Sequence, residues 1–538
     1  MQKGNEQNYL KGAAILAATT IFVKVVGAIY KIPIFNVMDD EGIGVFQTTY
    51  NVYALILTIA SAGVPVALSR MISAASATGR MGLVKRYYSV ALPAFAAIGV
   101  FAMSMMFFCS GSIAGLMNNS LAAPGIRVLA PAVFFICILA VYRGYTQGFQ
   151  NMMPTASTQV VEVLCKAAVG IVVALWLSRR GYDTSIVSGG AIAGVTIGLG
   201  LCIPLMMWHK RKTDRRIAPA GQGEDLPGRL AIFAKLMKVA IPITIGSSFM
   251  QIMIVIDNSV VLGRIQSGLG LAEKDASALY GLFTRALTIY NFPSALVVPV
   301  SISIMPAISA ALAKKQHGEA RDIMRSSLKL VNLLALPAAA GIMALASPIM
   351  QSLYNDPGKV TATILTILGA ASFFVCFQLI STAILQANGH ERLAMISFPV
   401  GGALKIAINY YLVATPGVGI VGPAIGTFTC FFVISAMNVC FIIAKVKDRP
   451  SFLAVIAKPL LCTALMAASA YGTYSLVIAV ASGTMGTGRA AITLYLAISI
   501  LAACLVYAVL VIVTGTVTRD DLRLIRKGDK IADMLRIK

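Results

Sequence analysis

The sequence predicts an all-α integral membrane protein with about fourteen transmembrane helices, built as two six-helix lobes in a parallel repeat plus two C-terminal helices. Hydrophobic residues make up 58% of the 538 residues, charged residues only 12%, and the mean hydropathy is +0.82. A water-soluble chain carries about twice that charged fraction. The apolar segments suit helices, which satisfy their own backbone hydrogen bonds in lipid, and are too long for barrel strands. The basic residues are also concentrated in every second loop.

Fourteen apolar segments reach the roughly 20 residues that a membrane-spanning helix needs. The connection from Thr415 to Gly419 is short and contains one proline and two glycines, which suit a turn between two helices. The predicted spans are residues 12–35, 44–69, 87–109, 125–148, 155–178, 186–208, 237–262, 279–308, 328–351, 361–387, 393–414, 420–444, 453–480 and 490–515.

The basic residues of the loops fall mainly on one side of the membrane. One alternate set of loops, which includes both chain ends, holds 32 of the 44 Lys and Arg, and the other set holds eight. The positive-inside rule therefore predicts that both termini are cytoplasmic. The net charge of +23 then faces the anionic leaflet, so it does not require nucleic acid as a partner.

One long polar segment divides the chain. Residues 209–236 form a basic, proline- and glycine-containing stretch that we interpret as a cytoplasmic linker. It separates an N-lobe with spans 1–6, residues 1–208, from a C-lobe with spans 7–12, residues 237–447. Residues 448–538 hold spans 13 and 14 and a basic cytoplasmic tail.

The two lobes resemble each other in sequence. A shift of 239 residues places Ala132-Val-Phe-Phe-Ile-Cys137 on Ala371-Ser-Phe-Phe-Val-Cys376, and Lys166 on Lys405. Six spans per copy is an even number, so both copies enter the membrane in the same sense. We therefore expect a repeat axis along the membrane normal and a substrate site between the halves.

Six ionisable side chains lie well inside the predicted spans. Glu162 and Lys166 are four residues apart on one helix, so we interpret them as a structural pair. Asp257, beside Asn258, is a candidate cation ligand, and a hydrogen-bonded helix end is the alternative we favour. The other three, which have no acidic neighbour on their own helix, are Lys24, Arg285 and Lys405.

The stretch from Tyr280 to Lys315 combines Arg285 with prolines 293, 299 and 306 in an apolar span. An arginine costs about 2.5–3.5 kcal/mol at the centre of a membrane helix on insertion scales, and proline removes a helix hydrogen bond. A simple anchor needs neither. Snorkelling of Arg285 from a helix end is the alternative, but a role in function, with the prolines as bends or gating points, fits better.

Cations that face a cavity between the lobes would attract an anion. Arginine donates bidentate hydrogen bonds to phosphate, and lysine acts as a point charge. Neutral polar residues nearby could bind sugar hydroxyls, although hydrogen bonding between helices explains them equally well. These candidates are Gln47, Asn51, Thr284, Tyr290 and Asn291.

No motif for catalysis is present. The chain has no GxxxxGK[ST] phosphate-binding loop, no nucleophile with a base, and no Cys or His at metal-ligand spacing. We therefore expect a transporter rather than an enzyme, with no metal and no cofactor. The energy for transport would come from a monovalent cation gradient or the membrane potential.

Several short motifs resemble one known family. They are Leu10-Lys-Gly-Ala-Ala14, Val23-Lys-Val-Val-Gly-Ala-Ile-Tyr-Lys-Ile-Pro33, Ala62-Gly-Val-Pro65 with Ser69-Arg70, Tyr142-Arg-Gly-Tyr-Thr-Gln-Gly-Phe-Gln-Asn-Met-Met-Pro-Thr155, Ile256-Asp-Asn258 and Phe292-Pro-Ser294. Together they resemble the SpoVB/YtgP branch of the MOP (multidrug/oligosaccharidyl-lipid/polysaccharide) superfamily, which is similar to the MurJ lipid II flippases. The resemblance covers nearly the whole chain.

This resemblance implies export of an undecaprenyl-pyrophosphate-linked sugar precursor, lipid II first, across the bacterial cytoplasmic membrane by alternating access. The precursor would serve peptidoglycan, spore cortex or polysaccharide synthesis. The implied partners are the lipid-linked oligosaccharide, membrane lipids and envelope-synthesis enzymes. The implied pyrophosphate site is a cationic central cavity: Lys24 and Lys31 match arginine positions of the first span, Arg285 matches the arginine before Phe-Pro in span 8, and Lys405 is added as a further cation.

Two other functions stay open. A MATE-like, cation-coupled drug exporter would share the fold, but a site for cationic drugs needs acidic residues, whereas the bases predominate here. A non-transporting scaffold for envelope synthesis would not need costly charges inside the membrane. Neither the sugar nor the choice between vegetative growth and sporulation follows from the sequence.

Overall fold

The computed structural model describes residue 15 and residues 18–215, 226–446 and 449–516, and all regular elements in these ranges are helical. Within them, fourteen helical segments are long and apolar enough to cross a membrane. The predicted class and number of spans are therefore confirmed: the protein is a multi-pass, all-α membrane protein. Several predicted features, including the motif Leu10-Lys-Gly-Ala-Ala14 and the basic tail after Thr516, lie outside the described residues.

The chain divides into two compact units, residues 1–284 and 285–538. The sequence-based boundary lies earlier, in the linker 209–236, but the helix that follows the linker packs on α3, α4 and α5 of the first unit. Both ends of this linker are helical, since α9 runs to Asp214 and α10 begins at Arg229. Composition marks the polar connection, whereas helix packing decides where one unit ends.

In the first unit, α7 is the helix around which the others pack. It contacts α3, α4, α5 and α9 directly. Residues 18–29 are also helical. The elements are α2 (Lys31–Val37), α3 (Asp40–Ser61), α4 (Gly63–Ala77), α5 (Met81–Phe108), α6 (Ser110–Leu116), η1 (Ser120–Ala122), α7 (Ala123–Gly148), α8 (Met153–Arg179), α9 (Thr184–Asp214), α10 (Arg229–Leu269) and the greater part of α11 (Glu273–Tyr290).

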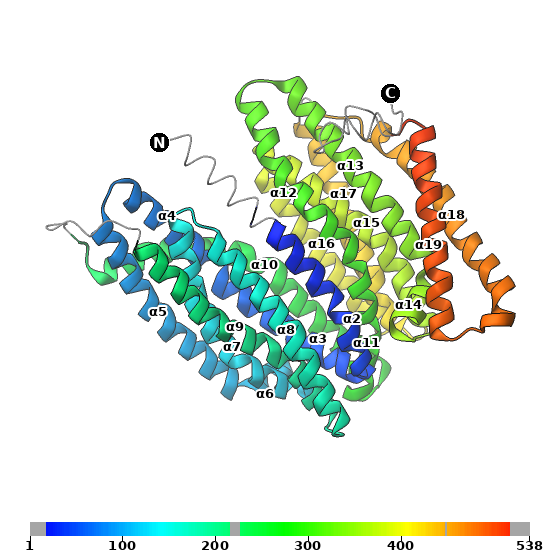
Figure 1. Ribbon diagram of the computed structural model, residues 1–538, viewed down its shortest axis with the longest axis horizontal. Helices are drawn as coiled ribbons and strands as arrows, with labels where there is room; N and C mark the ends of the chain where they lie inside the picture. The colour runs from blue at the N-terminus through cyan, green and yellow to red at the C-terminus, as the bar shows by residue number, and fades with distance from the viewer. Residues whose placement is uncertain (1–14, 16–17, 216–225, 447–448, 517–538) are drawn as a thin grey trace. The chain divides into compact units, whose positions relative to one another are not determined.

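In the second unit, α15 takes the corresponding central place and contacts α12, α13 and α17. The last two helices form an antiparallel pair, visible in orange and red in Figure 1, which packs on α13 and α14. The elements after α11 are α12 (Phe292–Ala313), α13 (His317–Ala344), α14 (Ala346–Tyr354), α15 (Lys359–Ala387), α16 (Glu391–Leu412), η2 (Gly419–Val421), α17 (Gly422–Lys445), α18 (Phe452–Met485) and α19 (Arg489–Val513).

The predicted repeat is visible in the packing of each unit taken by itself. In the first unit α5 packs on α7, α7 on α9, and α9 on α8. In the second, α13 packs on α15, α15 on α17, and α17 on α16. A short helix follows the first member of each series, α6 after α5 and α14 after α13. The shift of 239 residues therefore relates helices with equivalent neighbours.

Four predicted spans are interrupted, which corrects their description as single helices. The span 279–308 breaks at Asn291, and Pro293 lies in the first turn of the new helix, where its missing N–H costs no hydrogen bond. The spans 44–69 and 328–351 break at Ala62 and Leu345, and span 12–35 contains a turn at Tyr30. Hydropathy measures the length of an apolar segment and does not detect a change of helix direction within it.

Two glycines allow α3 and α11 to cross in backbone contact. A Cβ atom added to Gly44 would lie 2.0 Å from the carbonyl oxygen of Ser277, and one added to Gly281 would lie 1.9 Å from that of Asp40. Any side chain at either position would separate the helices, because small residues set the distance of closest approach in membrane helix pairs. The crossing fixes the position of α3, which carries several candidate site residues.

Candidate functional site

A chain of polar contacts connects α2 and α3 in the first unit. The ammonium group of Lys31 donates to Gln47 Oε1 over 3.3 Å, and Gln47 Nε2 donates to Asn51 Oδ1 over 2.7 Å. The turn at Tyr30 starts α2 at Lys31, while Gln47 and Asn51 are four residues apart on one face of α3. Three residues predicted for the site are therefore in contact.

A second lysine joins this group from α8. Lys166, at the middle of this 27-residue helix, donates from Nζ to the hydroxyl of Tyr50 over 3.1 Å. The same ammonium lies 4.4 Å from the centre of the Tyr50 ring and 4.9 Å from that of Tyr30. Lys31 Nζ lies 5.3 Å from the Tyr50 ring. Both cations thus share one tyrosine, and we name this set, Tyr30, Lys31, Gln47, Tyr50, Asn51 and Lys166, the lysine pair cluster.

The lysine pair cluster surrounds two amino groups with aromatic rings and neutral hydrogen-bond partners. Aromatic rings within about 6 Å attract an ammonium through their quadrupole, most strongly when water is excluded. Among the ion pairs of the described residues, none includes Lys31 or Lys166. Two positive groups held near each other by neutral partners can bind an anion, because an incoming phosphate would replace no protein carboxylate.

The structure corrects the predicted pairing of Glu162 with Lys166. Glu162 instead accepts from Arg143 of α7, with 3.3 Å between Oε2 and Nη2, and both side chains are largely shielded from solvent. Spacing along one helix permitted the first pairing, but the close packing of α7, α9 and α8 brings Arg143 to the carboxylate. Lys166 is consequently directed to the tyrosines.

In the second unit, Arg285 has an acidic neighbour from a distant part of the chain. Its Nη1 lies 3.7 Å from Oδ2 of Asp356, and each side chain is 12% exposed. The guanidinium also lies 5.7 Å from the centre of the Tyr354 ring. Asp356 Oδ1 accepts the N–H of Gly358, which orients the carboxylate. The predicted span 279–308 contains no acid, but Asp356 supplies a counter-ion for the charge of Arg285 from the loop after α14.

The remaining predicted residues lie on several different elements. Lys24 is exposed, and Lys405 is half-buried on α16. Thr284 and Asn291 each donate to a carbonyl one turn earlier, at 2.8 Å and 2.7 Å, and Tyr290 is buried.

Asp257 is a buried carboxylate on α10, with Asn258 buried beside it. No group of three or more Cys, His, Asp or Glu able to hold a metal occurs in the ranges that the structure describes. The candidate role of Asp257 as a cation ligand therefore stays a prediction that rests on this one carboxylate.

Sequence reasoning missed the aromatic partners and the counter-ions. Tyr50 lies between Gln47 and Asn51 at spacings of three and one, so a helical projection of α3 would have shown it near their face. Asp356 lies in the loop between α14 and α15, outside any predicted span. Its contact with Arg285 bridges 71 positions, and no local pattern predicts it.

Comparison with known families agrees with this fold. Residues 9–312, more than half of the chain, match the family model described as "Polysaccharide biosynthesis protein". Residues 242–411 also match the model described as "MatE". The two matches overlap over residues 242–312.

Individual relatives extend over most of the chain. The stage V sporulation protein B of Bacillus subtilis is 24% identical over 80% of this chain and 83% of its own length. The lipid II flippase MurJ of the same organism is also 24% identical, over 75% of this chain and 77% of its own length. A solved structure of lipid II flippase MurJ in an inward closed conformation superimposes with a TM-score of 0.69 at 16% identity, covering 93% of this chain and 98% of that one. The chain therefore belongs to the polysaccharide biosynthesis protein family, within the MOP superfamily of flippases and transporters.

Proposed function

We propose that this protein is a flippase for an undecaprenyl-pyrophosphate-linked sugar precursor, with lipid II as the first candidate, and that it works by alternating access in the bacterial cytoplasmic membrane. Its relatives in the family include a lipid II flippase and a sporulation protein. Peptidoglycan, spore cortex and another envelope polysaccharide are the destinations that this class of precursor serves. The protein would act as a transporter, with no catalytic group of its own.

The lysine pair cluster is the observation that carries the proposal. Lys166 occupies the middle of a membrane-spanning helix, where a positive charge costs the most, and Lys31 shares its tyrosine neighbour. A diphosphate carries several negative oxygens on adjacent phosphorus atoms, and it can contact two cations at once. Neutral amide groups of Gln47 and Asn51 lie alongside and could bind hydroxyl groups of a sugar.

The match to the MatE model supports export of a cationic drug as a second candidate. A cation-binding site needs available carboxylates, yet Glu162 pairs with Arg143 and Asp356 lies beside Arg285. Asp257 is the buried carboxylate on which this candidate depends. The sign of the charge in the lysine pair cluster therefore favours an anionic substrate over a cationic one.

The driving force and the orientation belong to the same proposal. The excess of basic residues in alternate loops predicts cytoplasmic termini. A charged lipid headgroup that moves with or against the membrane potential exchanges about 2.3 kcal/mol per charge for each 100 mV. A monovalent cation gradient or this potential would drive the cycle, and envelope-synthesis enzymes would supply and consume the precursor.

Complementation tests the proposal directly. A bacterial strain depleted of its lipid II flippase would express the full chain, and lipid II in the outer leaflet would be measured by its accessibility to an added degrading enzyme. The matched variants are Lys31→Ala, Lys166→Ala and, as a control, Lys314→Ala, which removes an exposed lysine at the end of α12.

We expect rescue by the unaltered protein and by Lys314→Ala. Each cluster variant should place at least about tenfold less lipid II in the outer leaflet, which is the effect of removing one hydrogen bond to a charged group. Failure of the well-expressed protein to rescue would move the assignment to another lipid-linked precursor. Undiminished rescue by both cluster variants would show that the pyrophosphate binds elsewhere.

A further inference from the structure

The first unit contains a cavity of about 420 Å³ between α4, α5 and α10, and no residue of the lysine pair cluster lines it. Each helix contributes one face of residues spaced four apart: Arg70 and Ala74 on α4, Leu83 and Tyr87 on α5, and Lys235 and Val239 on α10. Ligand pockets in proteins usually measure about 300–1,000 Å³, so the space is larger than a phosphate ion requires.

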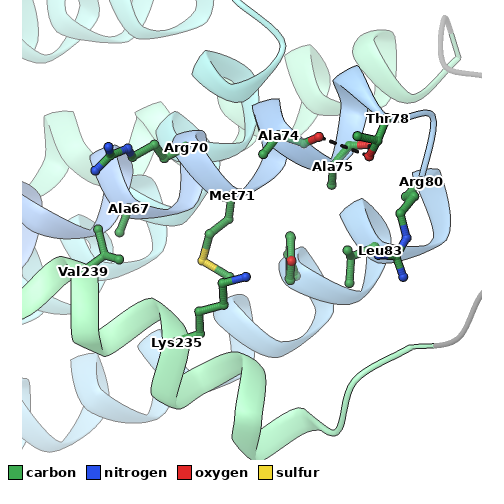
Figure 2. A pocket seen from close by; sticks show the side chains of 11 residues that line it. Ala67, Arg70, Met71, Ala74, Ala75, Thr78, Arg80, Leu83, Lys235 and Val239 are labelled. Atoms are coloured by element: carbon green, nitrogen blue, oxygen red, sulfur yellow. Dashed lines mark hydrogen bonds between the residues drawn. The ribbon is translucent and has the colours of Figure 1, made fainter.

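The cavity combines an apolar floor with a cationic rim. Met71, Ala75, Leu83 and Tyr87 of the floor are buried and belong to the hydrophobic core of the unit. Arg70, Arg80 and Lys235 are exposed, and Figure 2 shows them on different sides of Met71. None of the eleven residues that line the cavity is acidic.

The local backbone adds to this positive potential. The helix α5 begins directly after Arg80 and has no acidic residue in its first turn, so the positive end of its dipole adds to the rim. The opposite, negative end of α4 is capped: Thr78 Oγ1 donates to the carbonyl oxygens of Ala74 and Ala75 at 3.2 Å and 3.1 Å, as drawn in Figure 2. The carbonyl groups nearest the cavity are therefore already hydrogen-bonded.

We propose that this cavity, which we name the α4–α5–α10 pocket, binds the phosphate group of an anionic glycerophospholipid. Arg70 and Arg80 would donate to the phosphate oxygens and Lys235 would add a point charge. The glycerol and the first methylenes would contact Met71, Leu83 and Val239. An amphiphile fits both surfaces, whereas a soluble phosphate ester would leave the apolar floor in contact with water.

The position along the chain agrees with a lipid source. The pocket lies beside the connection between the end of α4 and the start of α5. The distribution of basic residues assigns this connection to the cytoplasmic side. That leaflet is rich in anionic lipids, and basic residues near its surface are attracted to them. The site is separate from the proposed transport site, so it does not depend on the identity of the transported precursor.

The test uses the full-length protein in detergent micelles and native mass spectrometry to count retained phosphatidylglycerol or phosphatidylcholine. The pocket variant is Arg70→Gln/Arg80→Gln/Lys235→Gln. A matched control is Lys314→Gln/Arg321→Gln/Arg325→Gln, which removes three exposed basic residues, also from a loop predicted to be cytoplasmic, and causes the same change in net charge. A second variant, Ala74→Trp, fills the pocket and leaves every charge in place.

We expect the unaltered protein and the control to retain phosphatidylglycerol in preference to phosphatidylcholine, and both pocket variants to bind it about fivefold more weakly or worse. Equal retention by all proteins would overturn the proposal. The proposal would also be overturned if phosphatidylglycerol bound equally weakly to the two triple variants and normally to Ala74→Trp. The lipid would then be attracted by the overall positive charge and not by this pocket. Pocket-dependent binding of glycerol phosphate as tight as that of the lipid would overturn the lipid source and assign the pocket to a soluble phosphate ester.

Discussion

Arg285 and Asp356, 71 positions apart in the chain, lie 3.7 Å from each other with only 12% of each side chain exposed. The arginine matches a position that the family resemblance assigns to substrate binding, yet it also has a protein counter-ion. The pair can therefore stabilise the second unit, bind an anion, or do both.

A double variant separates these roles. Arg285→Ala alone leaves a shielded carboxylate without its counter-ion, and breaking a fully buried pair costs about 3–5 kcal/mol, with a smaller loss expected at this partial exposure. Arg285→Ala/Asp356→Asn removes both charges and should regain most of the melting temperature in detergent. We expect rescue of the flippase-depleted strain to stay low in the double variant. Full recovery of transport would mean that the arginine serves structure alone.

Tyr50 is predicted to hold the two ammonium groups mainly through its ring. Tyr50→Phe keeps both ring faces and loses the hydroxyl that accepts from Lys166, so transport should fall only severalfold. Tyr50→Leu loses the ring as well. Because cation–π contacts contribute about 0.5–2 kcal/mol each, transport should fall more than tenfold.

The control for the Tyr50 series is Tyr182→Leu, which removes an exposed tyrosine that stacks on Trp176. Its transport rate should stay close to that of the unaltered protein. If Tyr50→Phe were as inactive as Tyr50→Leu, the hydroxyl rather than the ring would be the essential group.

The ion pair between Arg143 and Glu162 is expected to stabilise the first unit. Glu162→Ala leaves a poorly solvated guanidinium and should lower the melting temperature by several degrees, equivalent to about 1–3 kcal/mol. The exchanged pair Arg143→Glu/Glu162→Arg should restore a large part of the lost melting temperature. A double-mutant cycle should show coupling between Glu162→Ala and Arg143→Ala and little coupling between Glu162→Ala and Lys166→Ala, since Lys166 contacts the tyrosines instead. Equal coupling of Glu162 to Lys166 and to Arg143 would contradict the observed pairing.

The crossing of α3 and α11 should not tolerate a side chain. In Gly281→Ala the new Cβ would start 1.9 Å from the carbonyl oxygen of Asp40, so the helices must separate. We expect a sharp loss of monodisperse protein in size-exclusion chromatography. Gly246→Ala on α10 is the control, because nothing lies within 4 Å of a Cβ there, and alanine favours a helix by about 0.5–1 kcal/mol. Similar yields of both variants would refute the close crossing.

Much of the fold could be predicted because the bilayer imposes it locally. A lipid-facing backbone must form helices of about 20 residues, so apolar length alone located all fourteen spans. The repeat also left a readable signal, since Cys137 and Cys376 occupy equivalent helices α7 and α15. Breaks within spans, such as the one at Asn291, were missed because a change of helix direction does not alter hydropathy.

The sequence by itself determined that the chain is a multi-pass, all-α membrane protein with cations at costly positions, because composition and segment length act on each residue independently. Only the tertiary structure decided which groups those cations meet. Lys166 contacts Tyr50 instead of Glu162, Glu162 pairs with Arg143, and Arg285 lies beside Asp356. Helix packing brings these residues together, and their separation in the sequence does not predict the contacts. The same packing formed the α4–α5–α10 pocket from three helices that share no motif.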